Sequence, residues 1–227
     1  MNFKPIVMLL LVLCSLSLSI NKGFTKTLII SDSHGTGAFG SKLTNLYESQ
    51  KEEVSFFAYG GTTAIDWIEG NNLTWGFWEH QPGVQDVRST NQAAPIFEKL
   101  LKRIMPTQVI IVLGTNLLWR EHLPKDAGSI QSLINLSQEM GAKCFWVGPP
   151  DLKPKYENQQ RRVLEIHQQL EQEIPGTHCE LIKSWNFTTY PQGLGDGIHY
   201  DQIQGKGQEL AEAWASKVFE EITILKR

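Results

Sequence analysis

The stretch "TLIISDSHGTGAFG", residues 27–40, decides the fold and raises the question of function. It begins with a mostly apolar run, passes through Asp32, Ser33 and His34, and ends in glycines with the spacing G-x-G-x-x-G. An apolar run bounded by polar residues is typical of a buried parallel strand, and α/β sheets bind ligands beyond the carboxyl ends of such strands. The stretch therefore predicts a ligand site, which could hold a dinucleotide, bind metal ions, or present a nucleophilic serine.

Four further apolar runs recur along the chain, and helical patterns separate them. The predicted strands cover residues 27–31, 54–58, 108–114, 143–148 and 179–183. Between the strands, apolar residues recur every three or four positions, as they do from Leu210 to Ile222, which is typical of a helix that packs one face on a sheet. The alternation predicts an α/β fold, a three-layer α/β/α sandwich with a five-stranded parallel sheet.

The glycine spacing alone suggests a dinucleotide-binding turn, but its surroundings do not fit. The first glycine of such a turn follows its strand directly, whereas Ser31 to His34 intervene here and Asp32 would bring negative charge near a phosphate. The second strand ends in "FFAYGG", without the acidic residue that holds a ribose. We therefore predict that these glycines let the chain turn tightly into a following helix.

Asp32 and His34 favour a second interpretation, because they resemble the first block of the calcineurin-like metallophosphoesterases. Two metal ions need many more carboxylate, Asn and His ligands. The later blocks of that family do not occur in order, and "GTNLL" has no His after its Asn. A metallophosphoesterase remains a distant alternative.

The serine interpretation accounts for more of the chain. "AYGGTT" follows the second predicted strand, "LGTN" ends the third, and "GDGIHY" follows the fifth. With "SDS" at residues 31–33, these blocks resemble the SGNH, or GDSL-type, hydrolase family, in family order and over essentially the whole mature chain. The resemblance implies a flavodoxin-like SGNH hydrolase fold and an ester hydrolase that needs no metal or organic cofactor.

The resemblance also implies a role for each block. Ser33 would be the nucleophile, His199 the base that accepts its proton, and Asp196 the acid that orients the imidazole. The oxyanion hole would consist of the Ser33 and Gly61 N–H groups and the Asn116 side chain. Each block also has an interpretation without a catalytic role. "DGIH" could be a solvated turn, and Asn116 could cap a helix. The two glycines could form a turn that needs positive φ, and the donor could be Gly60 instead of Gly61.

Three positions depart from the family pattern. Ser31 replaces the usual Gly before the Asp, where we expect little effect. Leu117 replaces the usual Asp after Asn116, which removes a polar contact from that loop. His34 stands where an apolar residue is usual, and we expect it either at the surface or in contact with substrate.

Residues 66–92 form a long insert after the second predicted strand, and long loops in compact domains are usually functional or mobile. The insert carries Trp67, Trp75 and Trp78, and Trp119 follows Asn116. Aromatic faces stack on sugar rings, so these four residues are predicted to bind substrate. The alternative is that they anchor the loop to the body of the domain.

The first residues have the features of a signal peptide. Lys4 precedes an apolar run at residues 6–20 that is shorter than the ~20 residues of a membrane-spanning helix, and Ser17 and Ser19 fit a small-x-small cleavage site. We predict a signal peptide over residues 1–19, with cleavage as late as about residue 24, and a single domain over residues 25–227. An uncleaved anchor is the alternative.

Export would place the two cysteines outside the predicted signal peptide in an oxidising compartment. Cys144 and Cys179 both fall early in predicted strands, so they can form a disulfide, or they can be two small buried apolar side chains. We expect a periplasmic or secreted protein with no stable membrane insertion after signal cleavage.

Composition narrows the function further. The formal net charge of -3 argues against nucleic acid as a partner. The expected function is that of an exported serine esterase that removes small acyl groups, preferably O-acetyl groups, from a polysaccharide or cell-wall glycan. An acylated carbohydrate or another small ester would be its partner. An O-acyltransferase with the same triad and a non-catalytic glycan-binding module are the alternatives.

Overall fold

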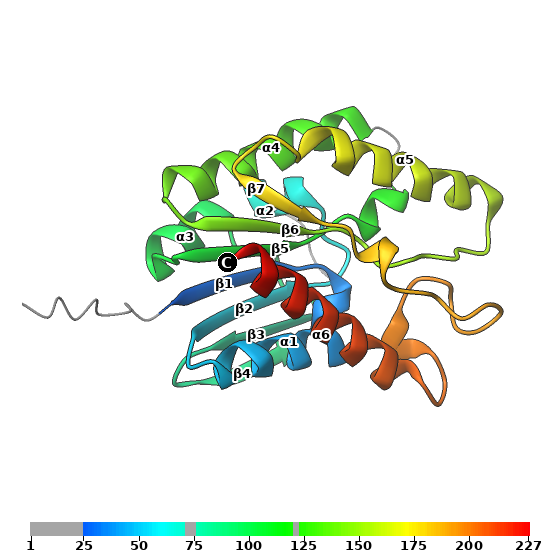
Figure 1. The fold of residues 1–227 in the computed structure, drawn as a ribbon, viewed down its shortest axis with the longest axis horizontal. Coiled ribbons are helices and arrows are strands. Elements are labelled where there is room, and N and C mark those ends of the chain that lie inside the picture. Colours follow the sequence, from blue (N-terminus) through cyan, green and yellow to red (C-terminus); the bar gives the residue numbers. More distant parts are fainter. Residues whose placement is uncertain (1–24, 71–75, 120–122) are drawn as a thin grey trace, which may run out of the picture.

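A seven-stranded sheet separates two layers of helices in the computed structural model, which describes residues 25–70, 76–119 and 123–227 (Figure 1). The strand order is β4-β3-β2-β1-β5-β6-β7. The strands are β1 (Lys26–Ser31), β2 (Glu53–Tyr59), β3 (Phe77–Gln81), β4 (Val84–Ser89), β5 (Gln108–Val112), β6 (Lys143–Val147) and β7 (Cys179–Ile182). β1, β2, β5, β6 and β7 are parallel, which confirms the five predicted strands.

The prediction of a five-stranded, purely parallel sheet is wrong. The expected insert at residues 66–92 contains the hairpin β3–β4, and β3 pairs antiparallel with β2 at the edge of the sheet. Every residue of β4 is exposed, so this strand has no apolar face that a hydrophobic pattern could reveal. The turn at Pro82 and Gly83 was the available signal.

Side chains alternate between the two layers along β1. Leu28 and Ile30 join the core beneath α2 to α5, whereas Ile29 joins the core beneath α1 and α6. The helices are α1 (Ala38–Ser49), α2 (Ala64–Glu69), α3 (Phe97–Ile104), α4 (Leu123–Glu139), α5 (Glu157–Glu173) and α6 (Gly207–Leu225). Short 3₁₀ turns are η1 (Ser33–Thr36), η2 (Thr115–Trp119), η3 (Ser184–Asn186) and η4 (Tyr200–Gln202).

The chain order places a topological switch at β1. The chain leaves β1 to form β2 on one side, and later returns to form β5 on the other side. Ligand sites of open α/β sheets lie at such switches, beyond the carboxyl ends of the strands. η1 and η2 follow β1 and β5 at this edge, so the fold itself brings Ser33 and Asn116 to the expected position.

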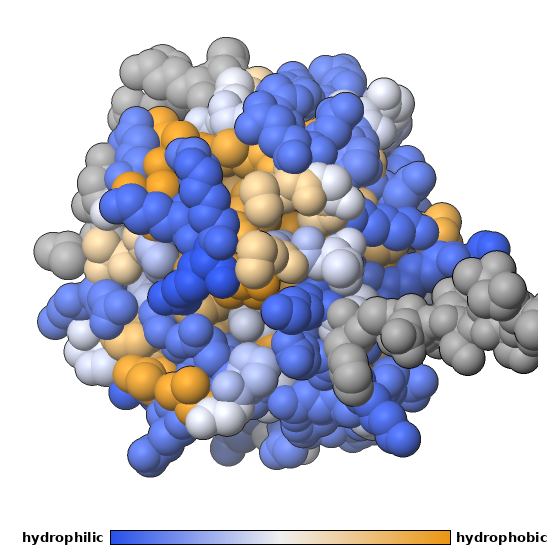
Figure 2. All heavy atoms as spheres, turned by 90° about the vertical axis from the view of Figure 1, so that its left-hand side faces the viewer, coloured by the Kyte–Doolittle hydropathy of each residue, from blue (hydrophilic) through white to orange (hydrophobic). Residues whose placement is uncertain are grey.

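The side of the molecule at the amino ends of the parallel strands faces the viewer in Figure 2. Apolar groups lie there among hydrophilic ones. Because the helices run antiparallel to the strands, this edge receives the carboxyl ends of α3, α4 and α6, next to which Met105, Met140 and Leu225 are exposed. Within the described residues, no helix has the length and apolar character needed to cross a membrane. The predicted signal peptide lies outside the described residues.

A disulfide joins β6 to β7. Cys144 and Cys179 are direct partners in the register of the two strands, with their Cα atoms 4.4 Å apart, and both side chains are buried. Of the two alternatives that the sequence left open, the structure contains the disulfide. The bond ties the last strand of the sheet to its neighbour.

The G-x-G-x-x-G glycines allow close packing. A Cβ at Gly35 would lie 2.5 Å from the Cβ of Ser31, and a Cβ at Gly37 would overlap the Asp201 carboxylate. A Cβ at Gly40 would overlap the carbonyl oxygen of Gly35. None of the three has a positive φ. The glycines instead leave room for the chain to pass from β1 through η1 into α1 more closely than side chains would allow.

This packing predicts a contrast between two helical glycines. Gly40→Ala should destabilise the protein by about 1–3 kcal/mol or more, because the new methyl meets backbone. Gly128→Ala in α4 should stabilise it by about 0.5–1 kcal/mol, because nothing lies within 4 Å of the added Cβ. Urea unfolding of both variants measures the difference, and equal effects would contradict the packing argument.

Candidate active site

Three predicted residues meet in one chain of hydrogen bonds. Ser33 begins η1 after β1, while Asp196 and His199 lie in the loop before η4. The Ser33 Oγ lies 3.0 Å from Nε2 of His199, and Nδ1 of His199 lies 2.6 Å from Oδ2 of Asp196. The order hydroxyl, imidazole, carboxylate is the geometry that lets an imidazole accept a serine proton.

The Asp196 carboxylate has several donors besides the imidazole. Its Oδ1 accepts the backbone N–H groups of Ile198 and His199, each at 2.8 Å, and the Tyr190 hydroxyl lies at 3.4 Å. Partial burial raises the pKa of Asp196, but the hydrogen bonds from His199 and Ile198 outweigh it and hold this pKa below its ordinary value. The carboxylate therefore stays ionised and can stabilise a protonated imidazole.

Two residues that the sequence analysis missed hold this loop. The Tyr190 hydroxyl accepts the Gly197 N–H at 3.1 Å, and the Tyr190 N–H donates to Oδ2 of Asp151 at 3.0 Å. The Lys153 N–H donates to the Gly197 carbonyl at 2.8 Å. Asp151 follows β6 at the same edge of the sheet, and a carboxylate after a buried strand was the signal that could have found it.

The turn that carries Ser33 is held from two sides. Asp32 caps η1, since its Oδ1 accepts the His34 N–H at 3.0 Å. On the other side, Arg88 of β4 donates to the Thr36 carbonyl at 2.5 Å and lies over the Trp78 ring, 4.4 Å from its centroid. The hairpin that the sequence did not predict therefore braces the turn that carries Ser33.

Two candidate oxyanion donors flank this turn. The Gly60 N–H donates to the Gly76 carbonyl at 2.8 Å, whereas the Gly61 N–H makes no hydrogen bond to any residue that the structure describes. Asn116 does not cap a helix with its side chain: its Nδ2 donates to the Thr62 carbonyl at 3.0 Å. That bond places the Asn116 amide beside Gly61, with a second N–H remaining. This arrangement favours Gly61 over Gly60.

The four tryptophans that were predicted to bind substrate differ in their exposure. Trp67 is fully buried, with its Nε1 on Thr62 Oγ1 at 3.2 Å, and Trp78 is buried beneath Arg88. Both predictions of substrate contact are wrong, and the anchoring alternative holds for these two rings. Trp119 is 52% exposed at the end of η2, so its role on substrate stays a prediction. Trp75 lies outside the described residues.

The departures from the family pattern have structural counterparts. Leu117 is buried in the core beneath α2 to α5, so an apolar contact replaces the usual polar one. Ser31 is buried, and its Oγ has no hydrogen-bond partner among the described residues. His34 is also buried, so the expectation of a surface position is wrong.

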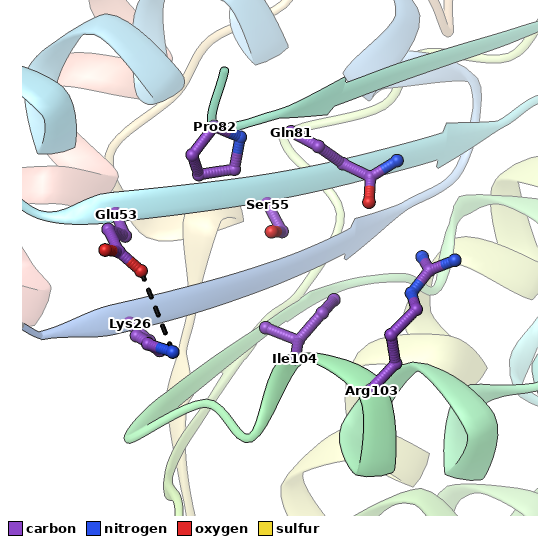
Figure 3. Close-up of a pocket in the computed structure, with 7 residues that line it drawn as sticks. All are labelled: Lys26, Glu53, Ser55, Gln81, Pro82, Arg103 and Ile104. Atoms are coloured by element: carbon purple, nitrogen blue, oxygen red, sulfur yellow. Dashed lines mark ion pairs between the residues drawn. The ribbon is translucent and has the colours of Figure 1, made fainter. Parts of the chain in front are cut away.

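Neither a metal centre nor the pocket in Figure 3 coincides with this site. The described ranges contain no group of three or more His, Cys, Asp or Glu residues that could hold a metal ion. The pocket, of about 270 Å³, opens at the amino ends of β1 and β2. Lys26, Glu53 and Arg103 line it, and Lys26 forms an ion pair with Glu53 at one side of it. The pocket therefore lies at the amino ends of the strands, whereas Ser33 lies beyond the carboxyl end of β1.

The fold has counterparts among solved structures. No protein-family model and no curated protein matches the sequence. A putative SGNH hydrolase from Slackia heliotrinireducens matches with a TM-score of 0.54 at 14% identity, over 86% of this chain and 98% of that one. The chain has an SGNH hydrolase-type fold.

Two esterases share this SGNH fold. A family 3 carbohydrate esterase from Clostridium thermocellum matches with a TM-score of 0.54 at 14% identity, over 89% of this chain and 98% of that one. The psychrotrophic esterase EstA from Pseudoalteromonas matches with a TM-score of 0.50 at 14% identity, over 88% of this chain and 98% of that one.

Asp32 predicts a pH dependence of stability. Burial raises its pKa from 3.8 to about 7, against the opposing effects of the His34 N–H and the His199 charge. The native state therefore holds a proton that the unfolded chain has lost above about pH 4. The stability contributed by this proton is full below pH 4 and is lost as the pH rises through 7.

Asp32→Asn removes this titration and keeps an oxygen that accepts the His34 N–H. The unfolding free energy of the variant minus that of wild type should rise by up to about 3 kcal/mol as the pH increases from 5 to 8. His34 titrates in both proteins, so its contribution cancels in the difference. Urea unfolding at four pH values measures this difference, and a constant value would show that Asp32 is not protonated in the native state.

Proposed function

We propose that this protein is a serine esterase that works through an acyl-enzyme on Ser33. The observation that carries the proposal is the continuous contact from the Ser33 hydroxyl through the His199 imidazole to the Asp196 carboxylate. Two structural neighbours that bear esterase names support it. The buried turn around Ser33 and the saturated Asp196 carboxylate support a preorganised catalytic site.

The residues define the steps. His199 Nε2 takes the hydroxyl proton as Ser33 Oγ bonds to the ester carbonyl carbon, and Asp196 stabilises the imidazolium. The carbonyl oxygen becomes an oxyanion facing the Gly61 N–H and the Asn116 amide. The alcohol leaves with the proton from His199. Water then adds to the acyl-enzyme with His199 as base, which releases the acid and restores the hydroxyl.

The substrate that we propose is a small acyl ester on a carbohydrate, with O-acetyl groups preferred. The predicted signal peptide would bring the enzyme to extracellular or cell-envelope glycans, where it would act as a periplasmic or secreted protein. Trp119, exposed at the end of η2, offers an aromatic face on which a sugar ring can stack. One neighbour of similar fold is named a carbohydrate esterase.

Replacing the nucleophile tests the proposal. Ser33→Ala should abolish hydrolysis of p-nitrophenyl acetate, with a loss on the order of 10⁴-fold or more. Ser31→Ala, a matched change at a buried serine outside the relay, should keep the wild-type rate, and a chelator should have no effect. Activity that survives Ser33→Ala and disappears with chelator would instead support the metallophosphoesterase.

Natural substrates separate the remaining alternatives. Acetate release from O-acetylated xylan fragments supports the esterase. Acetyl transfer to an added glycan that exceeds hydrolysis would identify an O-acyltransferase. Glycan binding without any turnover by wild type would identify a non-catalytic module.

Asn116 should contribute through its amide N–H. Asn116→Ala should lower kcat by about 10²–10³-fold with little change in KM, because its donor meets charge that develops only in the transition state. The isosteric Asn116→Asp has no donor and should lose at least as much. Steady-state kinetics well below the melting temperature measure both, and a loss confined to KM would remove Asn116 from the oxyanion hole.

A further inference from the structure

His34, which follows the nucleophile directly, is placed against the catalytic imidazole. Its ring centroid lies 5.5 Å from that of His199, and 5.1 Å from that of Trp214 on α6 in an edge-to-face arrangement. The side chain is only 5% exposed. Its Nε2 is buried and has no hydrogen-bond partner among the described residues. The relay makes no use of this ring.

A buried, unpartnered ring nitrogen is unfavourable, so we expect His34 to contribute through the packing of its ring and not through this nitrogen. Phe39 packs against Trp214 with 3.9 Å between ring centroids and 31° between ring planes, and both side chains belong to the core beneath α1 and α6. Phe39, Trp214 and His34 thus form a series of aromatic contacts that extends from α1 and α6 to the His199 ring.

The charge state of His34 fits contact with a base that becomes charged. Burial, and then the charge of His199, lower the pKa of His34 to about 3, against an opposing effect of Asp196. The His34 ring is therefore neutral at pH values well above 3. A neutral neighbour does not repel the imidazolium that forms during acyl transfer.

The His199 ring is fixed at its two nitrogen atoms, by Ser33 on one side and Asp196 on the other. These hydrogen bonds alone do not fix the rotation of His199 about its Cα–Cβ and Cβ–Cγ bonds, and a ring packed against its side restricts that rotation. We propose that His34 is a positioning residue that packs beside the His199 ring and holds it in line between Ser33 and Asp196. The kinetic part of this inference rests on the proposed esterase function.

Two variants distinguish the contribution of the shape of the His34 ring from that of its nitrogen atoms. His34→Ala removes the contact, whereas His34→Phe keeps a ring of similar shape and removes the unpartnered nitrogen. His167→Ala is the matched control, because His167 is a histidine on α5 that stacks on Trp185 at 4.1 Å and also has a buried, unpartnered Nε2. His167 has no contact with the relay.

Kinetics give the first readout. His34→Ala should lower kcat by about 10–100-fold with KM nearly unchanged, a fraction of what a general base contributes. His34→Phe should stay near wild type in kcat and match or exceed its melting temperature. His167→Ala should lower the melting temperature without lowering kcat. The inference is overturned if His34→Phe loses as much kcat as His34→Ala, or if His34→Ala behaves like His167→Ala.

A second readout does not depend on turnover. The proton between His199 Nδ1 and Asp196 should give a strongly deshielded NMR signal, which a His199→Gln variant identifies. The signal should persist in His34→Phe and His167→Ala and broaden or vanish in His34→Ala. If wild type hydrolyses nothing while this pattern holds, the esterase function fails and the positioning role stands. If the signal persists in His34→Ala, the positioning role fails.

Discussion

The contact between Ser33 Oγ and His199 Nε2 joins two segments that are 166 residues apart in the chain. Ser33 can occupy its position because β1 lies at the centre of the sheet and ends at the topological switch. His199 reaches it because the loop after β7 is tied to the segment after β6 through Tyr190 and Asp151. The active-site geometry is therefore a property of the carboxyl edge of the whole sheet.

Two buried or half-buried aspartates at the carboxyl ends of the strands have pKa values that are shifted in opposite directions. Asp196 is surrounded by N–H donors, and its pKa lies below the ordinary value. Asp32 has fewer donors and is almost completely buried, so its pKa rises to about 7. Environments that push the pKa values of similar groups apart are typical of catalytic sites. Here the lowered pKa belongs to Asp196, the carboxylate that contacts the imidazole it would stabilise.

The sequence carries enough information to predict the parallel strands from their local apolar runs, and the relay residues from blocks that resemble those of the SGNH family. Buried strands are apolar along their length, and Ser33, Asp196 and His199 stand in recognisable blocks at strand ends. The hairpin β3–β4 could not be predicted from apolar pattern, since β4 is wholly exposed. Burial of Trp67 and His34 depends on partners distant in the chain, so a tryptophan in a presumed loop, or a histidine after a nucleophile, looked exposed.

The central claim is that the Ser33 hydroxyl is activated by His199. A fluorophosphonate ester reacts covalently with such a hydroxyl, and peptide mapping by mass spectrometry locates the adduct. The account predicts one adduct, on Ser33, that forms rapidly in the wild-type protein and is lost in His199→Ala. Failure of Ser33 to react, or equal labelling in the presence and absence of His199, would contradict it.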